Sequence, residues 1–382
     1  MNVNELIEIS RFYGSNPEYT LAGGGNTSCK DDKTLIVKAS GTSLAQATED
    51  SFVKMNRHAL SRIWDKTYSD SSDEREKEVL TDLMNARNEG ERATEAARQK
   101  RPSVEALLHD IIPFSFVVHL HPALVNGICC SQDGEAAIKE IFGNDALWIP
   151  STNPGYILSR LVKIEMTEYN KKYQKNASLV FLQNHGVFVG SDSSDGIKRT
   201  YEDIMSKIGA KVKNHPDFSD ETRIFASSDL SYKTDVGKII DTLSGLAGYS
   251  CFMQSNAIMR FIKDKNSFYP VSSAFTPDHI VYSGSDPLFT SAKDPVLLKD
   301  EWNNHVKKTG RNPKIAAVKD LGVFSAAATE KAACFACDLF KDTVKVAIYS
   351  ESFKGPLFMT QDKIDFINNW EVERFRSSVS TK

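Results

Sequence analysis

The chain has 382 residues, of which 41% are hydrophobic and 25% are charged, a composition typical of a folded globular protein and not of a disordered or membrane-embedded one. Its 47 basic and 50 acidic residues leave a formal charge of -3, which supplies no net attraction to nucleic acid or anionic lipid. The N-terminus lacks the basic and apolar segments of a secretion signal, and no apolar run is long enough to span a bilayer. We therefore expect a cytoplasmic protein that acts on a small molecule, without a nucleic-acid or membrane partner.

The N-terminal part of the chain predicts helices, a strand and two short loops rich in backbone donors. Residues 4–13 carry apolar side chains at helical spacing, and residues 34–39 have the pattern of a strand. A glycine-rich loop at 23–28 precedes this strand, and Ser40-Gly41-Thr42-Ser43 follows it. Residues 73–84 predict an amphipathic helix whose charges form a solvated face.

From residue 102 onward, predicted helices and strands alternate, which is typical of an α/β or α+β layered domain. The predicted segments are a short helix from Pro102-Ser103, helices at 123–130, 135–142, 156–173 and 194–213, and strands at 114–118, 146–149, 178–182 and 187–189. A polar stretch at 214–220 contains a proline and marks the expected boundary. We expect one domain over 1–218 and a C-terminal α/β extension over 219–382, which lacks a dinucleotide-binding fingerprint.

Two histidines one residue apart are the strongest chemical signal. A strand sends residues i and i+2 to the same face, so His119 and His121 would project side by side from one strand end. A third imidazole, His185 after the next apolar strand, would complete a catalytic Zn²⁺ site with one open position. Taken alone, the motif is short, and an ordinary pair of core or surface histidines stays open.

Two further motifs favour structural roles. Cys334 and Cys337 have redox-motif spacing, but they lie in an alanine-rich helical run and are expected as buried helix residues. Asp278 and His279 are expected in a capping turn before a strand at 280–282, although they could reach a neighbouring active site.

Five short motifs, in chain order, together indicate one protein family. They are Gly25-Asn26-Thr27-Ser28, Ser40-Gly41-Thr42, Pro102-Ser103-Val104-Glu105 with His109, His119-Leu120-His121-Pro122, and His185-Gly186. Together they resemble the class II aldolase and adducin head domain family, over roughly residues 10–215. This resemblance implies an α/β fold, a three-layer αβα class II aldolase-like sheet, followed here by the C-terminal α/β extension.

A longer branch of the family is similar over nearly the whole chain. It resembles the aldolase part of bifunctional rhamnulose-1-phosphate aldolase/alcohol dehydrogenases in the charged segment before Pro102, in residues 276–279 and in residues 321–324. Shorter members have a second serine where this chain has Val104, so one hydroxyl donor is lost. The reductase domain of the bifunctional members is not expected in this chain.

The resemblance also implies site roles. The metal ligands would be His119, His121 and His185, holding Zn²⁺ or another divalent metal, and Glu105 would be the catalytic acid/base. The substrate phosphate would be held by Asn26, Gly41, Thr42 and Ser103. Glycine-rich loops can aim successive N–H groups at one anion, and a helix start at Ser103 would add a favourable dipole. His109, one turn after Glu105, is expected to support the site and not to be a fourth ligand.

The implied reaction is the cleavage of a ketose 1-phosphate, of the rhamnulose or fuculose type, into dihydroxyacetone phosphate and an aldehyde. Such a metal-dependent aldehyde-lyase works through a metal-stabilised enediolate, and the resemblance implies a homo-oligomer. Two alternatives stay open: a sugar-phosphate epimerase or sugar-acid lyase on the same scaffold, and a non-catalytic adducin-like scaffold. Loss of the metal histidines would mark the scaffold, and all three are present.

Overall fold

The protein is described by a computed structural model that covers residues 2–88, 90, 99–225 and 234–380. The chain forms two compact units, one of residues 1–125, 134–210 and 369–380, the other mainly of residues 126–133 and 211–368. This division differs from a single boundary after residue 218. Residues 126–133 belong to the second unit, and residues 369–380 belong to the first.

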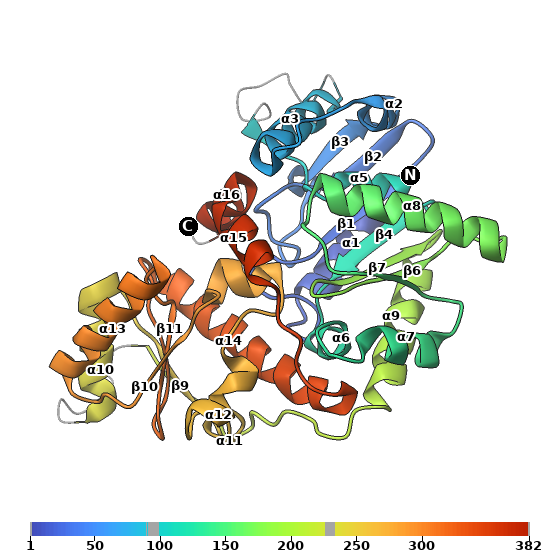
Figure 1. The fold of residues 1–382 in the computed structure, drawn as a ribbon. Coiled ribbons are helices and arrows are strands. Elements are labelled where there is room, and N and C mark those ends of the chain that lie inside the picture. The colour runs from blue at the N-terminus through green and yellow to red at the C-terminus, as the bar shows by residue number, and fades with distance from the viewer. Residues whose placement is uncertain (1, 89, 91–98, 226–233, 381–382) are drawn as a thin grey trace. The chain divides into compact units, whose positions relative to one another are not determined.

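A seven-stranded sheet forms the centre of the first unit, with strand order β3-β2-β1-β4-β7-β6-β5 (Figure 1). The strands are β1 (Asn26–Lys30), β2 (Thr34–Lys38), β3 (Phe52–Asn56), β4 (Phe116–Leu120), β5 (Leu147–Ile149), β6 (Leu179–Leu182) and β7 (Gly186–Ser191). All neighbours are antiparallel except β5 and β6. The sequence placed residues 23–28 in a loop, and this is wrong for Asn26 to Ser28, which pair within the sheet between β2 and β4.

Helices cover both faces of this sheet, which confirms the three-layer αβα class. On one face α1 (Val3–Gly14) and α9 (Ser194–Gly209) pack together, and on the other α5 (Ala106–Ile111) packs against α8 (Tyr156–Tyr173). Both helices of the first face carry an N-cap side chain, Asn2 for α1 and Ser193 for α9, and each buries one apolar stripe. The remaining helices are α2 (Arg57–Ser61), α3 (Ser72–Asn85), α6 (Ala123–Cys129), α7 (Gly134–Phe142) and α16 (Glu371–Ser380), with 3-10 turns η1 (Glu49–Ser51) and η2 (Arg62–Asp65).

The second unit is also α/β, as expected for the extension. Its five-stranded sheet has the order β10-β11-β12-β9-β8, and only β10 and β11 are parallel. The strands are β8 (Thr222–Ile224), β9 (Phe252–Gln254), β10 (Leu288–Thr290), β11 (Ile315–Val318) and β12 (Gly322–Ser325). The helices are α10 (Asp235–Ala247), α11 (Asn256–Met259), α12 (Lys265–Phe268), α13 (Pro295–Thr309), α14 (Glu330–Ser350) and α15 (Gln361–Asn369), with short turns η5 (Tyr269–Val271) and η7 (Glu351–Phe353). An apolar core joins α10 and α13 to this sheet.

The prediction for the two cysteines of this unit is confirmed, whereas the strand predicted after Asp278 and His279 is not. Cys334 and Cys337 lie in α14 as expected, although only Cys337 is fully buried. The strand expected at 280–282 is wrong, because His279 opens a π-helical turn, η6 (His279–Ser283). This turn packs against α14, where a buried hydrogen bond joins His279 Nε2 to Asp342 Oδ2 over 3.0 Å.

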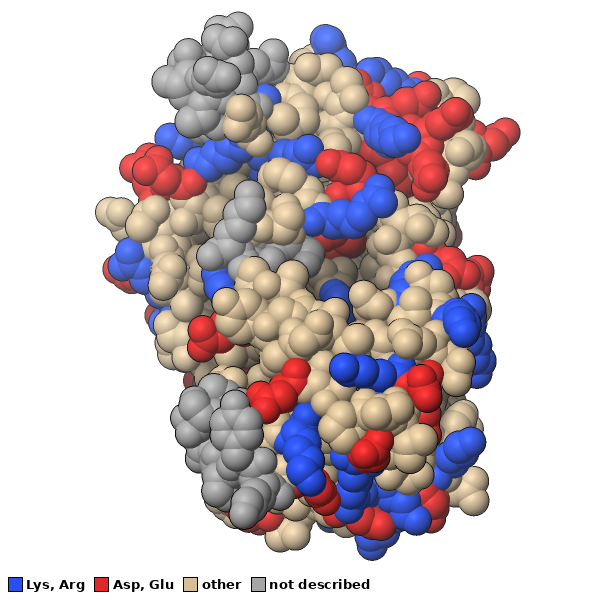
Figure 2. Space-filling model, turned by 90° about the vertical axis from the view of Figure 1, so that its left-hand side faces the viewer, with Lys and Arg blue, Asp and Glu red and all other residues tan. Residues whose placement is uncertain are grey.

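Within the described residues, no helix combines the length and the apolar character that crossing a membrane requires. On the face drawn in Figure 2, basic and acidic side chains are interspersed among other residues.

Candidate metal centre

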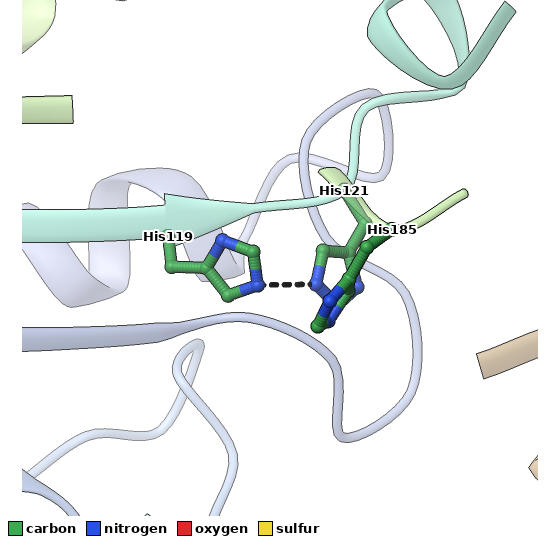
Figure 3. A group of neighbouring side chains, drawn as sticks. All are labelled: His119, His121 and His185. Carbon is green, nitrogen blue, oxygen red and sulfur yellow. Dashed lines mark hydrogen bonds between the residues drawn. The ribbon is translucent and has the colours of Figure 1, made fainter. Parts of the chain in front are cut away.

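Three histidines converge at the end of β4 (Figure 3). His119 is the penultimate residue of that strand, and His121 follows just after it. The turn between β6 and β7 carries His185, and β7 pairs with β4 so that this turn is brought beside the strand end. Their ligand nitrogens all lie within 4.8 Å of one another, so the structure brings together the three residues that the sequence selected.

The ring of His119 is held in one orientation by its neighbours. Its Nδ1 lies 3.0 Å from the carbonyl oxygen of Val187, and a carbonyl only accepts, so Nδ1 carries the proton. The ring stacks on Phe188 with centroids 3.9 Å apart. The Nε2 atom therefore presents its lone pair to the other ligands, where it accepts a hydrogen bond from His121 Nε2 over 2.8 Å. This is the arrangement that fixes a metal-binding tautomer.

Gly186 allows the two chain segments to approach this closely. A Cβ on this residue would lie 2.5 Å from the Leu120 carbonyl oxygen and 2.6 Å from the His121 ring. Those separations are too short for any side chain, so the glycine after His185 is a packing requirement of the centre.

Glu105 lies beside the three histidines. Its carboxylate is buried, and Oε1 lies 3.4 Å from His119 Nε2 and 3.5 Å from His185 Nε2. Within the described part of the chain, Oε1 accepts no hydrogen bond although it is buried. Three imidazoles form a donor set that Zn²⁺ commonly takes in catalytic sites, so the residues present fit a divalent ion.

A line of hydrogen bonds holds the other oxygen of Glu105. Asn26 Nδ2 donates to Glu105 Oε2 over 2.6 Å, and Asn26 Oδ1 accepts from His109 Nε2. Burial lowers the pKa of His109 well below its ordinary value, so the neutral ring accepts at Nδ1 from Ser28 Oγ over 2.7 Å. His109 thus supports the site as expected. Sequence reasoning missed Ser28, which the i, i+2 spacing to Asn26 would have revealed had β1 been predicted.

The residues expected to hold phosphate lie in two places. The loop after β2 carries Gly41 and Thr42, and it is paired with the segment before α5 because Ala39 bridges Pro102 and Ser103 N donates to Lys38 O. This pairing brings Ser103 to the same loop. Asn26 instead has its side chain engaged with Glu105 and His109.

The predicted helix start at Ser103 is wrong, because α5 begins at Ala106 and Glu105 is its N-cap. Ser103 Oγ accepts from the Glu105 N–H over 3.2 Å and so forms a turn before the helix. A six-residue helix that starts three residues later adds little dipole at this hydroxyl.

Comparison with known proteins identifies the family of the chain. The profile of the Class II Aldolase and Adducin N-terminal domain matches residues 4–204, more than half of the 382-residue chain. The chain therefore belongs to the class II aldolase and adducin N-terminal domain family.

The individual relatives have low sequence identity to this chain. The chain is 24% identical over 308 residues to the uncharacterized oxidoreductase YuxG of Bacillus subtilis (strain 168), which covers 75% of this chain and only 42% of that protein. Among solved structures, the N-terminal class II aldolase domain of a conserved Thermoplasma acidophilum protein aligns at 24% identity with a TM-score of 0.45, covering 55% of this chain and 93% of that one. The L-fuculose-1-phosphate aldolase of Thermus thermophilus aligns at 12% identity with a TM-score of 0.33, covering 55% and 92%.

Proposed function

We propose that this protein is a divalent-metal-dependent aldolase that cleaves a ketose 1-phosphate into dihydroxyacetone phosphate and an aldehyde. The observation that carries the proposal is the convergence of His119, His121 and His185, with the buried Oε1 of Glu105 beside two of them. The three histidines would hold the ion, with Zn²⁺ as the first choice because of the imidazole-rich donor set. When bound, the ion supplies Lewis acidity that stabilises negative charge on the substrate oxygens.

In this proposal Glu105 exchanges the proton on the substrate carbon. Asn26 fixes Oε2, which leaves Oε1 facing the histidines as the atom that accepts and returns the proton. Neutral His109 holds Asn26 in turn, so the carboxylate is oriented before substrate arrives. An acid/base residue placed in this way contributes about 10²–10⁴-fold to the rate.

Substrate phosphate is assigned to the loop after β2 and to the turn before α5. Gly41, Thr42 and Ser103 supply backbone and hydroxyl groups there, and Gly41 has a φ of 81°, a conformation that glycine adopts without strain. Asn26 would join them through its second amide hydrogen. The relation to the aldolase part of bifunctional rhamnulose-1-phosphate enzymes belongs to this proposal, and the match to part of a longer protein named as an oxidoreductase is consistent with it.

A second candidate is a lyase or epimerase that acts on a sugar acid or a sugar phosphate. It is favoured by the engagement of Asn26 with Glu105, which leaves fewer donors for a phosphate, and by the apolar Val104 in place of a hydroxyl. The proton chemistry of Glu105 and the three histidines would be the same. A purely structural role, as in adducin-like scaffolds, gives no reason for the histidine cluster.

The test is metal analysis of the purified protein together with product analysis across phosphorylated and unphosphorylated ketoses and sugar acids. We expect about one divalent ion per chain and release of dihydroxyacetone phosphate from a ketose 1-phosphate. Thr42→Val should raise KM for the phosphorylated ketose, whereas Thr81→Val, on the exposed face of α3, should not. Equal kcat/KM with and without phosphate, unchanged in Thr42→Val, would move the assignment to the sugar-acid lyase.

A further inference from the structure

The helix α16 lies against the loops assigned to phosphate. Three of its residues, Glu371, Phe375 and Val379, are spaced i, i+4 and i+8 and therefore form one stripe of the helix. At one end of the stripe, a Cβ added to Gly41 would lie 2.8 Å from Cγ1 of Val379, so this side chain sits directly on the loop. At the other end the stripe meets Arg101.

Arg101 is a cation that the sequence analysis did not select. Its carbonyl oxygen accepts from the Ser40 N–H over 2.9 Å, and it lies two residues before Ser103, so it belongs to both loops. Its guanidinium donates to both carboxylate oxygens of Glu371, over 3.0 and 2.8 Å, and lies 4.0 Å from the centre of the Phe375 ring. Both hydrogen bonds come from one nitrogen, Nη1, and the oxygens of a phosphate can accept from this nitrogen as the carboxylate oxygens do.

The contact between the stripe and the loops is only partly buried. The side chains of Arg101 and Glu371 are 24% and 46% exposed, and Val379 is 39% exposed. The start of the helix is anchored more firmly, because Trp370 and Val372 are buried. Exposed ion pairs contribute little to stability, so another anion can replace the Glu371 carboxylate on Arg101 at low cost.

We infer that Arg101 recognises the anionic group of the substrate, and that Glu371 occupies its guanidinium until that group displaces the Glu371 carboxylate. The ligand class is a phosphate monoester or free inorganic phosphate. The inference rests on the proposed function for the role of the two loops, and it adds to that function a charged recognition residue and a carboxylate that competes for it.

Titration of inorganic phosphate into the full chain by calorimetry tests this exchange. Glu371→Gln removes the competitor and should tighten phosphate binding about two- to fivefold, the effect of losing one exposed ion pair. Arg101→Gln should weaken it by about tenfold or more, and Arg101→Lys should fall between this variant and the wild type. Glu168→Gln, which breaks the exposed pair with Lys171 on α8, is the matched control and should change nothing.

A merely structural ion pair predicts a different pattern, because removing either partner would then have the same consequence. Shifts of phosphate affinity in the same direction for Glu371→Gln and Arg101→Gln would overturn the inference. If Arg101→Gln fails to fold, Glu371→Gln and Arg101→Lys still decide.

The measurements of phosphate affinity do not depend on enzymatic turnover. Opposite shifts of phosphate affinity without cleavage of any ketose phosphate would leave the inference standing and the proposed reaction wrong. Cleavage of a ketose phosphate with parallel shifts would leave the reaction standing and overturn the inference.

Discussion

The side-chain amide of Asn26 donates to Glu105 Oε2 over 2.6 Å, although the two residues are 79 positions apart in the sequence. One oxygen of the carboxylate is thereby fixed, and the other faces His119 and His185. We expect Asn26→Ala to lower turnover by about tenfold or more through loss of this orientation. In a Glu105→Gln background the same substitution should have little further effect, because the two residues act together.

The measurement for this pair is a double-mutant cycle on kcat. Asn176→Ala, at an exposed position, serves as the control and should leave kcat unchanged. Equal effects of Asn26→Ala in the two backgrounds would show that Asn26 acts independently of Glu105.

Replacing His185 with alanine should release the metal. The loss of affinity should exceed the roughly 10–100-fold that follows removal of a residue hydrogen-bonded to a ligand, because a ligand itself is lost. Zinc content after dialysis, measured by mass spectrometry, tests this. His58→Ala, on an exposed part of α2, should retain the wild-type content. Full occupancy in His185→Ala would remove this residue from the ligand set.

The substitution Glu105→Gln separates catalysis from binding. Metal content and phosphate affinity should stay near the wild-type values, while kcat falls by about 10²–10⁴-fold because the amide neither accepts nor returns the proton. Steady-state kinetics with parallel metal analysis measures the two effects. Near-normal kcat would exclude Glu105 as the acid/base.

Gly186→Ala should destabilise the centre even though it adds a single methyl group. The new Cβ would lie 2.5 Å from the Leu120 carbonyl oxygen, so β4 and the β6–β7 turn must separate, at a cost of about 1–3 kcal/mol. Gly245→Ala in α10 is the matched control, since nothing lies within 4 Å of its added Cβ. There alanine should be neutral or stabilising. Thermal melting with and without Zn²⁺ compares them, and similar melting temperatures for both variants would contradict the steric argument.

Lys30 should make stability depend on pH. Burial lowers the pKa of Lys30 from 10.5 to about 7, against an opposing effect of Asp110, while its Nζ donates to the His109 carbonyl oxygen. The unfolded chain then binds more protons than the folded chain between pH 7 and 10, so stability rises with pH there, by up to about 2 kcal/mol between pH 7 and 9. Lys30→Met should flatten this rise in denaturant titrations. An equally steep rise in the variant would assign it to other groups.

Features that depend on neighbouring residues were predictable from the sequence. The helix at 156–173 follows from its own apolar spacing and has the predicted bounds. The projection of His119 and His121 from one strand end follows from the two-residue period of a strand. These patterns are properties of a few consecutive residues, so the chain encodes them locally.

Features that depend on distant partners were not predictable. The segment from Asn26 to Ser28 lacks an apolar pattern, and it becomes a buried strand because β2 and β4 lie on either side of it and its side chains find partners such as Ser10 and His109. A buried polar strand is stable only when those partners are in place, and nothing in its own residues announces them.

The same distinction applies within the site, between the residues chosen from the sequence and the contacts that only the structure shows. The sequence by itself selected His119, His121, His185 and Glu105, whereas only the tertiary structure decided that Asn26 orients Glu105 and that Arg101 meets Glu371 across 270 positions. Hydrogen bonds between side chains depend on strand register and helix packing to within an ångström. Those relations are set when the whole unit folds, because the free energy that fixes them comes from the core and not from the pair itself.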